Sequence, residues 1–175
     1  GPAMRAPILG ASFADDEAGL RAAVRASTRL THRDARAEAG ALAIALATAA
    51  AVRSPDSTFD ASALLAELRR ASAGDEELSR ALALAEENLQ LGSTPRQFAD
   101  ALGLRGGISG YIHHTVPVAL YCWLRAPGDF RAAITEVIAL GGDTDTTAAI
   151  VGGMAGAHVG AAQLPTEWVS GLRDW

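Results

Sequence analysis

The sequence predicts an all-α protein. Hydrophobic residues make up 49% of the 175 residues and aromatic residues only 5%, with alanine dominating the apolar set. Alanine is the best helix former, and β-branched residues are a minority. Apolar residues recur at helical spacing between repeated capping signals. We therefore expect a compact orthogonal multi-helix bundle of about nine helices, with one core of the size that a chain of this length can bury.

Start signals predict five helices in the first half of the chain. Ser12 and Asp15 form a box-like capping pair. Residues 35–52 are almost all alanine, leucine and isoleucine, which is typical of a helix in the middle of a fold, and Ser54-Pro55-Asp56 ends this run. Gly92 to Pro95 supplies a stop, a cap and a proline for the first helical position. The expected helices cover 12–30, 35–52, 60–72, 76–91 and 95–102.

Glycine separates the expected helices of the second half. Residues 103–110 are glycine-rich and read as a flexible stretch, and Gly141-Gly142 ends a helix. Gly152, Gly156 and Gly160 recur every four residues, so we expect a face that is nearly free of side chains and closely packed by another helix. The expected helices cover 111–125 (with Pro117 in the first turn), 130–140, 143–162 and 164–175.

Charge and cysteine content exclude several classes of protein. The net charge is −5, which argues against direct nucleic-acid binding because contacts with phosphates need a basic face. A lone cysteine, Cys122, excludes an intramolecular disulfide framework and fits a reducing compartment; we expect it to be buried and inert. The apolar run 148–164 is too short and too rich in glycine for a membrane span, and no signal-peptide pattern is visible. We expect a cytoplasmic protein that does not contact membranes.

Residues 141–147, Gly-Gly-Asp-Thr-Asp-Thr-Thr, carry the most informative chemical signal. Carboxylates and hydroxyls are oxygen ligands of the kind that Mg²⁺, Mn²⁺ or Ca²⁺ prefers. The alternating positions of Asp143 and Asp145 let both carboxylates converge on one ion, and without a cation they would repel each other. Helix capping is the alternative, because an Asp or Thr before a helix satisfies free backbone N–H groups. A cap, however, needs only one carboxylate.

The histidines give weaker signals. His32 follows Thr31 at the start of the most apolar helix, where a surface or capping role is the simplest interpretation. His113 and His114 are adjacent and point in different directions on a helix, so at most one of them faces a site. The sequence has no Cys/His zinc spacing, no serine-nucleophile elbow and no phosphate loop.

Five segments, in order, resemble the ADP-ribosylglycohydrolases of the dinitrogenase-reductase-activating type. The stretch 141–152 is similar to the C-terminal signature of that family, and 156–168 to its ending. Ser109-Gly110-Tyr111-Ile112 is similar to its Gly-Tyr-Val helix start, and Leu30-Thr31-His32 to its Thr-His helix. Residues 1–8 resemble its Gly-Asn-Gly loop from the second glycine onward, although Gly1-Pro2 also matches the pair that a tag-removing protease leaves.

The resemblance implies hydrolysis of a glycosidic bond to ADP-ribose, on a protein side chain or a related ADP-ribosyl compound, at a centre of two Mg²⁺ or Mn²⁺ ions. It implies that Asp143, Asp145 and Thr146 are metal ligands, with the two carboxylates catalytic. It also implies that His32 and Tyr111 contact ADP-ribose, and that Gly1 belongs to a loop near the phosphates and the distal ribose. Two cations can hold ribose hydroxyls and acidify water, and carboxylates suit an oxocarbenium-like transition state.

One departure from the family is large. The glutamate and the Thr-Asp-Asp segment that supply its remaining metal ligands have no match here, since Asp15-Asp16 follows an alanine. We therefore expect residues 1–175 to be the C-terminal part of a single domain without its N-terminal helices. Half of the ligands would then be absent from this chain, and the N-terminal part of the same protein, as a separate chain, is one candidate source. A non-catalytic ADP-ribose-binding or structural relative is the alternative; an unrelated helical interaction domain is disfavoured by five motifs in order.

Overall fold

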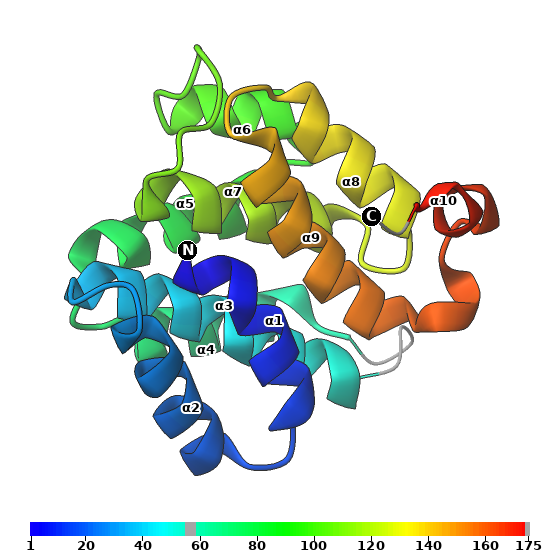
Figure 1. The fold of residues 1–175 in the computed structure, drawn as a ribbon. Helices are drawn as coiled ribbons and strands as arrows, with labels where there is room; N and C mark the ends of the chain where they lie inside the picture. Colours follow the sequence, from blue (N-terminus) through cyan, green and yellow to red (C-terminus); the bar gives the residue numbers. More distant parts are fainter. Residues whose placement is uncertain (55–58, 174–175) are drawn as a thin grey trace.

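The computed structural model describes residues 1–54 and 59–173 of the chain. These residues form a compact all-α fold, which confirms the predicted class, and their only β pairing is a single bridge between Ile108 and Gly142. Figure 1 shows the helices crossing one another around a common centre. The elements are α1 (Pro2–Ser12), α2 (Glu17–Arg29), α3 (Ala35–Arg53), α4 (Ala61–Ala71), α5 (Glu76–Gln90), α6 (Pro95–Ala101), α7 (Ile112–Arg125), α8 (Phe130–Ala139), α9 (Thr144–Val159), the 3₁₀ turn η2 (Ala161–Gln163) and α10 (Thr166–Gly171).

Capping explains where most of these helices begin. An aspartate precedes each of α2, α3, α4, α5 and α8, and its side chain accepts a hydrogen bond from a backbone N–H of the first turn. Thr94 and Gln97 form a reciprocal capping box at the start of α6, with Pro95 at the first helical position. Such caps satisfy donors that the helix leaves unpaired and contribute about 1 kcal/mol each.

Helix α3 lies at the centre of the bundle and contacts α1, α2, α7 and α9 (Figure 1). Its middle residues, such as Ile44, Ala45 and Ala47, have no exposed surface. By length and composition alone α3 could cross a membrane, but 61% of that apolar window is buried inside the fold, which is typical of a core helix. Alanine at these positions lets neighbouring helices approach closely, so the many alanines of α3 allow tight packing in the core.

The N-terminal segment differs from the prediction. Residues 1–8 were expected to form a loop, but the chain is helical from Pro2 and only Gly1 precedes the helix as its N-cap. Proline suits the first helical position because its missing N–H would be unpaired there anyway. Helix α1 is held by extensive packing on α3, where Gly10 meets the Ala45 backbone so closely that a β-carbon would overlap it. Tertiary packing therefore overrides the loop interpretation.

The glycines of α9 also behave differently from the prediction. Gly152 and Gly156 face the Ile134 and Phe130 side chains of α8, at 3.3 and 3.7 Å from an ideal β-carbon, rather than a helix backbone. The closest approach is at Gly153, where a β-carbon would lie 2.5 Å from Pro7 of α1. Gly160, with φ of 76°, ends the helix instead of continuing it to residue 162. A positive φ is accessible to glycine at little cost, which makes it a natural helix terminator.

Smaller boundary predictions had mixed outcomes. Pro117 is the sixth residue of α7, so it lies in the second turn and not the first. Cys122 is fully buried as expected, and burial raises the pKa of its thiol to about 12, which leaves it protonated at neutral pH. Helix α10 ends at Gly171. The predicted break at Pro55-Asp56 and the predicted helix end at Trp175 lie outside the described residues.

Candidate active site

The turn before α9 is clamped to the glycine-rich segment that precedes α7. The N–H of Ile108 donates to the Gly141 carbonyl at 3.0 Å, and the N–H of Asp143 donates to the Ile108 carbonyl at 2.7 Å. Gly141 and Gly142 have φ of 75° and 85°, and a β-carbon on Gly142 would overlap the Ile108 backbone. Glycine is required at this point because the conformation and the close approach both exclude a side chain. The pairing fixes where Asp143 enters the helix.

Asp143 does not cap its helix through its side chain. It occupies the N-cap position of α9, yet its carboxylate accepts no capping hydrogen bond, whereas Asp34, Asp75 and Asp129 all do at their helices. One carboxylate oxygen instead faces the bare backbone of Gly110, where a β-carbon would lie 2.8 Å away. Simple capping therefore does not account for the Asp143 side chain, and its oxygens remain available to a ligand.

Asp145 is exposed in the first turn of α9. Hydrogen bonding with the Asp143 carboxyl, followed by backbone N–H groups of Thr146 and Asp145, holds the pKa of Asp145 below its usual range. The two carboxyl groups are thus close enough to interact directly, and neither has an ion-pair partner within 1–54 and 59–173. Ionising both of two neighbouring carboxyl groups is unfavourable, and either a shared proton or a cation between them relieves the repulsion.

Four of the residues predicted to form the site line one cavity of about 210 Å³, although they come from four distant segments. Gly1 packs against the His32 ring, since a β-carbon on Gly1 would lie 3.1 Å from its Cε1. The Nδ1 atom of His32 is 2.9 Å from the Thr31 hydroxyl, which orients the ring. Asp143 and Asp145 are not among the lining residues, but Gly110, which Asp143 faces, is. The predicted residues in the lining are Gly1, His32, Tyr111 and Thr146.

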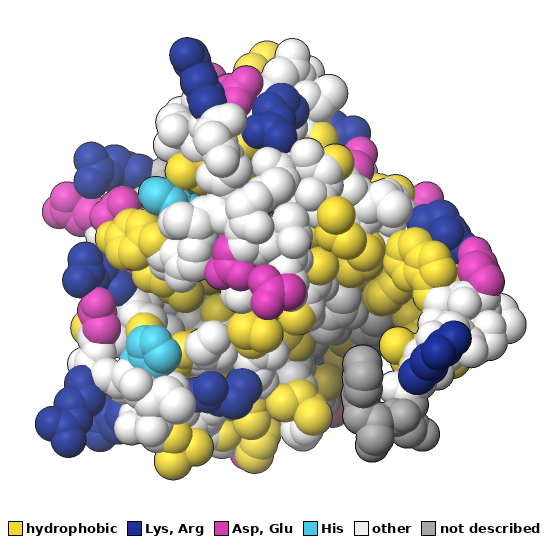
Figure 2. Space-filling view, turned by 45° about the horizontal axis from the view of Figure 1, so that its top comes forward, with side chains coloured by type: hydrophobic (Ala, Val, Ile, Leu, Met, Phe, Trp, Pro, Cys, Tyr) yellow, Lys and Arg dark blue, Asp and Glu magenta, His cyan; other side chains and the backbone are white. Residues whose placement is uncertain are grey.

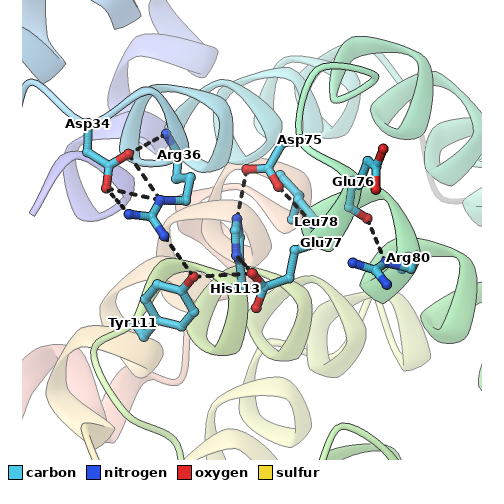
Figure 3. Close-up of polar contacts among 9 residues, drawn as sticks. All are labelled: Asp34, Arg36, Asp75, Glu76, Glu77, Leu78, Arg80, Tyr111 and His113. Carbon is cyan, nitrogen blue, oxygen red and sulfur yellow. Dashed lines mark hydrogen bonds and ion pairs between the residues drawn. The ribbon is translucent and has the colours of Figure 1, made fainter.

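A polar network that the sequence did not predict holds Tyr111 at this cavity (Figure 3). The Tyr111 hydroxyl accepts a hydrogen bond from Arg36 Nη1 at 3.3 Å and donates one to Glu77 Oε2 at 3.3 Å. Arg36 is paired with Asp34 at 2.9 Å, and this pairing lowers the pKa of Asp34. The N-termini of α3, α5 and α7 meet here, and their positive dipole ends favour the carboxylates.

His113 lies beneath this network with only 3% of its surface exposed. Its Nε2 atom is 2.7 Å from Asp75 Oδ2, and its Nδ1 atom is 2.8 Å from Glu77 Oε2. His114, its neighbour, is half-buried and lies 2.8 Å from the Ser109 hydroxyl through Nδ1. The polar partners of the two histidines differ, but both rings pack edge-on against Tyr111 at 5.1 Å, so the expectation that at most one of them faces a site does not describe their surroundings. Sequence spacing could not reveal the His113 contacts, because its partners lie 38 and 36 residues away on another helix.

A larger cleft of about 640 Å³ adjoins the cavity and shares His32 and Asp34 with it. One side is basic, with Arg25, Arg29 and Arg33, and the other is acidic through the start of α5. In Figure 2 histidine side chains lie left of the centre, arginine and acidic side chains are spread around the rim, and further acidic and apolar groups lie near the middle. The cavity therefore opens onto a charged surface of both signs.

Comparison with known proteins identifies the family. The family model described as ADP-ribosylglycohydrolase matches residues 1–175. The chain belongs to this family. It is 39% identical over 75 residues to ADP-ribosylhydrolase ARH3 of Bos taurus, which covers 37% of this chain and 20% of that protein. It is 34% identical to ADP-ribosylhydrolase ARH3 of Gallus gallus (59% of this chain, 30% of that protein) and 34% identical to ADP-ribosyl-[dinitrogen reductase] glycohydrolase of Rhodospirillum rubrum (39% and 23%). The matched stretches therefore cover less than a third of the length of each of these relatives.

The donors at the start of α9 fit part of a metal centre for a member of the ADP-ribosylglycohydrolase family. The carboxylates of Asp143 and Asp145 and the hydroxyl of Thr146 are hard oxygen ligands, and the Asp143 carboxylate is not used as a cap. However, the described part of the chain contains no group of three or more His, Cys, Asp or Glu side chains that could hold a metal ion. These residues alone do not make a closed site.

Proposed function

We propose that this chain is part of an enzyme that hydrolyses a glycosidic bond to ADP-ribose with the help of two divalent cations, Mg²⁺ or Mn²⁺. The observation that carries the proposal is the pair of carboxylates at the α9 start, of which Asp143 is spared from capping. Family membership and the convergence of Gly1, His32 and Tyr111 on one cavity support it. The substrate would be an ADP-ribosylated protein or a small ADP-ribosyl compound.

Each group of residues has a distinct role in this proposal. Asp143, Asp145 and Thr146 hold the cations, which supply Lewis-acid stabilisation of oxygen ligands and of developing negative charge. His32 and Tyr111 bind ADP-ribose in the cavity that they line, and Gly1 allows the ligand a close approach because it has no side chain. The carboxylates also favour the positive charge that develops at the anomeric carbon as the glycosidic bond breaks.

The remaining metal ligands would come from outside the described residues. Two carboxylates and a hydroxyl are too few for tight binding, because an open carboxylate cluster stays solvated. We propose that the N-terminal part of the same protein supplies them, as a continuous or a separate chain. The free Cys122 thiol supports a cytoplasmic location for the assembled enzyme.

Metal binding and turnover test the proposal in two steps. Calorimetric titration of Mn²⁺ into residues 1–175 should give weak binding; tight binding of two ions would contradict the claim that the site is incomplete. The complete protein, with Mg²⁺ or Mn²⁺, should release ADP-ribose from peptides ADP-ribosylated on arginine or serine, or from a small ADP-ribosyl compound. Chelation with EDTA should abolish this release, and unchanged release after chelation would refute the metal role.

A non-catalytic relative that binds ADP-ribose is the second candidate, and the small number of metal-binding side chains favours it. This reading predicts that ADP-ribose binds the complete protein but that no linkage is cleaved with metal present. Binding by calorimetry and turnover on the same preparation separate the two candidates. A chain that neither binds ADP-ribose nor releases it would exclude both.

A further inference from the structure

We propose that His113 is the positioning residue for Tyr111 and that its proton controls how firmly Tyr111 is held at the cavity. The inference rests on the proposed function only in naming ADP-ribose as the ligand that Tyr111 meets. It is carried by a chain of contacts that runs from the buried imidazole through Glu77 to the Tyr111 hydroxyl (Figure 3). His113 itself does not line the small cavity, so it acts through these partners.

Glu77 Oε2 is the link between the two side chains. The same oxygen lies 2.8 Å from His113 Nδ1 and 3.3 Å from the Tyr111 hydroxyl. Hydrogen bonding with His113 lowers the pKa of Glu77, so the carboxylate is ionised when it accepts from Tyr111. The Glu77 side chain is 53% exposed and would otherwise be free to move, and the imidazole is what holds it in place.

Both nitrogens of His113 face carboxylates, which makes its charge state important. A neutral imidazole has one N–H, whereas the imidazolium has two and can donate to Asp75 and Glu77 together. The Nδ1 contact is the weaker one, since the oxygen lies off the N–H direction and Nδ1 has no aligned hydrogen bond in the described structure. When His113 loses a proton, the N–H at Nδ1 is therefore lost first, and the contact with Glu77 is lost with it. The Nε2 atom keeps its 2.7 Å contact with Asp75.

The groups around His113 determine whether its imidazole is charged or neutral. His113 is the second residue of α7, where the helix dipole disfavours a cation, so the charged form depends on the two carboxylates. Asp75 is fixed, because its other oxygen caps α5 by accepting from the Leu78 N–H at 3.1 Å. The other titratable groups that face this region from α3, α5 and α7 are Asp34, Arg36, Glu76, Arg80, Tyr111 and His114.

Loss of the His113 proton has a defined consequence for the cavity. Glu77 is released toward solvent, and the Tyr111 hydroxyl keeps only the bond from Arg36. The Tyr111 ring, 37% exposed, is then held by the Arg36 bond and by edge contacts with the His113 and His114 rings at 5.1 Å each, so it is fixed less firmly at the cavity wall. The affinity of the cavity for ADP-ribose falls, because the ligand must select the ordered ring from a larger set of conformations.

The first experiment needs no ligand. In residues 1–175 with labelled tyrosine and histidine, NMR follows the χ1 rotamer population of Tyr111 and the ring protonation of His113 between about pH 5 and 8. Tyr111 should occupy one rotamer while His113 is charged and average over several once the proton is lost. A Tyr111 rotamer distribution that does not change when His113 loses its proton would overturn the proposal.

Variants separate the positioning role from a merely structural one. In H113Q, Tyr111 should be averaged at every pH, while the matched control E76Q, at the exposed neighbour of Glu77, should behave like the unmodified chain. If H113Q does not fold, E77Q provides the test: without the linking carboxylate, the Tyr111 rotamer should no longer follow the protonation of His113. A Tyr111 rotamer that still follows His113 in E77Q would contradict the coupling.

The second experiment measures ADP-ribose affinity by calorimetry across the same pH range. The dissociation constant of the unmodified protein and of E76Q should rise about tenfold as His113 loses its proton, and that of H113Q should stay constant. A pH dependence that persists in H113Q would overturn the role of His113. Failure of ADP-ribose to bind at any pH would refute the proposed ligand, and the rotamer measurement would still decide whether His113 positions Tyr111.

Discussion

Two acidic regions border the candidate site, and they differ in how their charges are matched. At the starts of α3 and α5, Asp34 is paired with Arg36, while Asp75 and Glu77 both contact His113. At the start of α9, Asp143 and Asp145 lie beside each other, with no arginine or histidine paired to them among the residues described. The first region supplies its own cations and the second does not.

This difference separates carboxylates that build the fold from carboxylates left for a ligand. Asp34 and Asp75 each use one oxygen to cap a helix and the other to hold a cationic side chain, so both oxygens are satisfied. Asp143, like Asp34 and Asp75, is an aspartate at an N-cap position, yet its carboxylate makes no capping bond. Unmatched charge kept in a clamped turn is costly unless a cation neutralises it.

The largest expected effect is at Asp145 in the complete enzyme. Asp145→Asn should reduce turnover at least about 100-fold, because even residues that only orient a metal ligand cost up to that much. Thermal unfolding should change little, since the side chain is exposed. Asp15→Asn, at an exposed aspartate between α1 and α2, is the matched control and should keep full turnover. Retention of most activity in Asp145→Asn would refute its assigned role.

The clamp that presents these carboxylates can be broken at Gly142. Gly142→Ala should lower the free energy of unfolding by more than about 2 kcal/mol, because a β-carbon both requires an unfavourable positive φ and overlaps Ile108. Gly74→Ala, where a β-carbon meets nothing within 4 Å, should change it by no more than about 0.5 kcal/mol. Urea denaturation measures both. Equal stability of the two variants would show that the turn is not held by the Ile108 pairing.

The same substitution should have different effects in the two acidic regions. Asp75→Asn keeps a capping side chain but removes the charge beside the buried His113, so it should destabilise the fold by about 1–3 kcal/mol. Asp143→Asn removes no capping bond, so in metal-free buffer it should leave the free energy of unfolding nearly unchanged. Chemical denaturation of both variants measures the two changes in the free energy of unfolding. Destabilisation of a similar size in Asp143→Asn would remove the contrast between the regions.

The smallest expected effect is on acid stability. The folded-state pKa values of Asp34 and Glu77 lie below their ordinary values of 3.8 and 4.5. Their contribution to stability is therefore complete above these ordinary values and is lost as the pH falls through the lower folded-state values. Glu77→Gln should flatten the decline of unfolding free energy below about pH 4.5, as followed by urea denaturation at several pH values. An unchanged decline would show that Glu77 contributes nothing to acid stability.

Much of the fold could be predicted because the signals are local. The apolar run of α3 and the Pro95 start each depend on neighbours within a few residues, and the structure confirms them. The expected Ser12–Asp15 capping pair was wrong, because Ser12 is the last residue of α1 and the Asp16 side chain caps α2 instead. Helix α1 was missed because two prolines and a glycine in eleven residues argue against a helix locally, whereas packing against α3 and α9 decides the outcome. Within α9, the glycine that another helix approaches most closely is Gly153 and not Gly152 or Gly156. Which glycine this is likewise depends on the helix that lies opposite.

For the candidate site, too, some features follow from the sequence and others only from the tertiary structure. The sequence by itself determined the helical class, the Asp-Thr-Asp-Thr turn and the family resemblance, because these depend on residue type and short spacing. Only the tertiary structure decided that Asp143 leaves its cap unused, that Gly1, His32, Tyr111 and Thr146 share one cavity, and that His113 is enclosed by Asp75 and Glu77. The physical reason is that charge pairing and cavity formation join helix ends that lie far apart along the chain, and helical periodicity carries no information about which ends will meet.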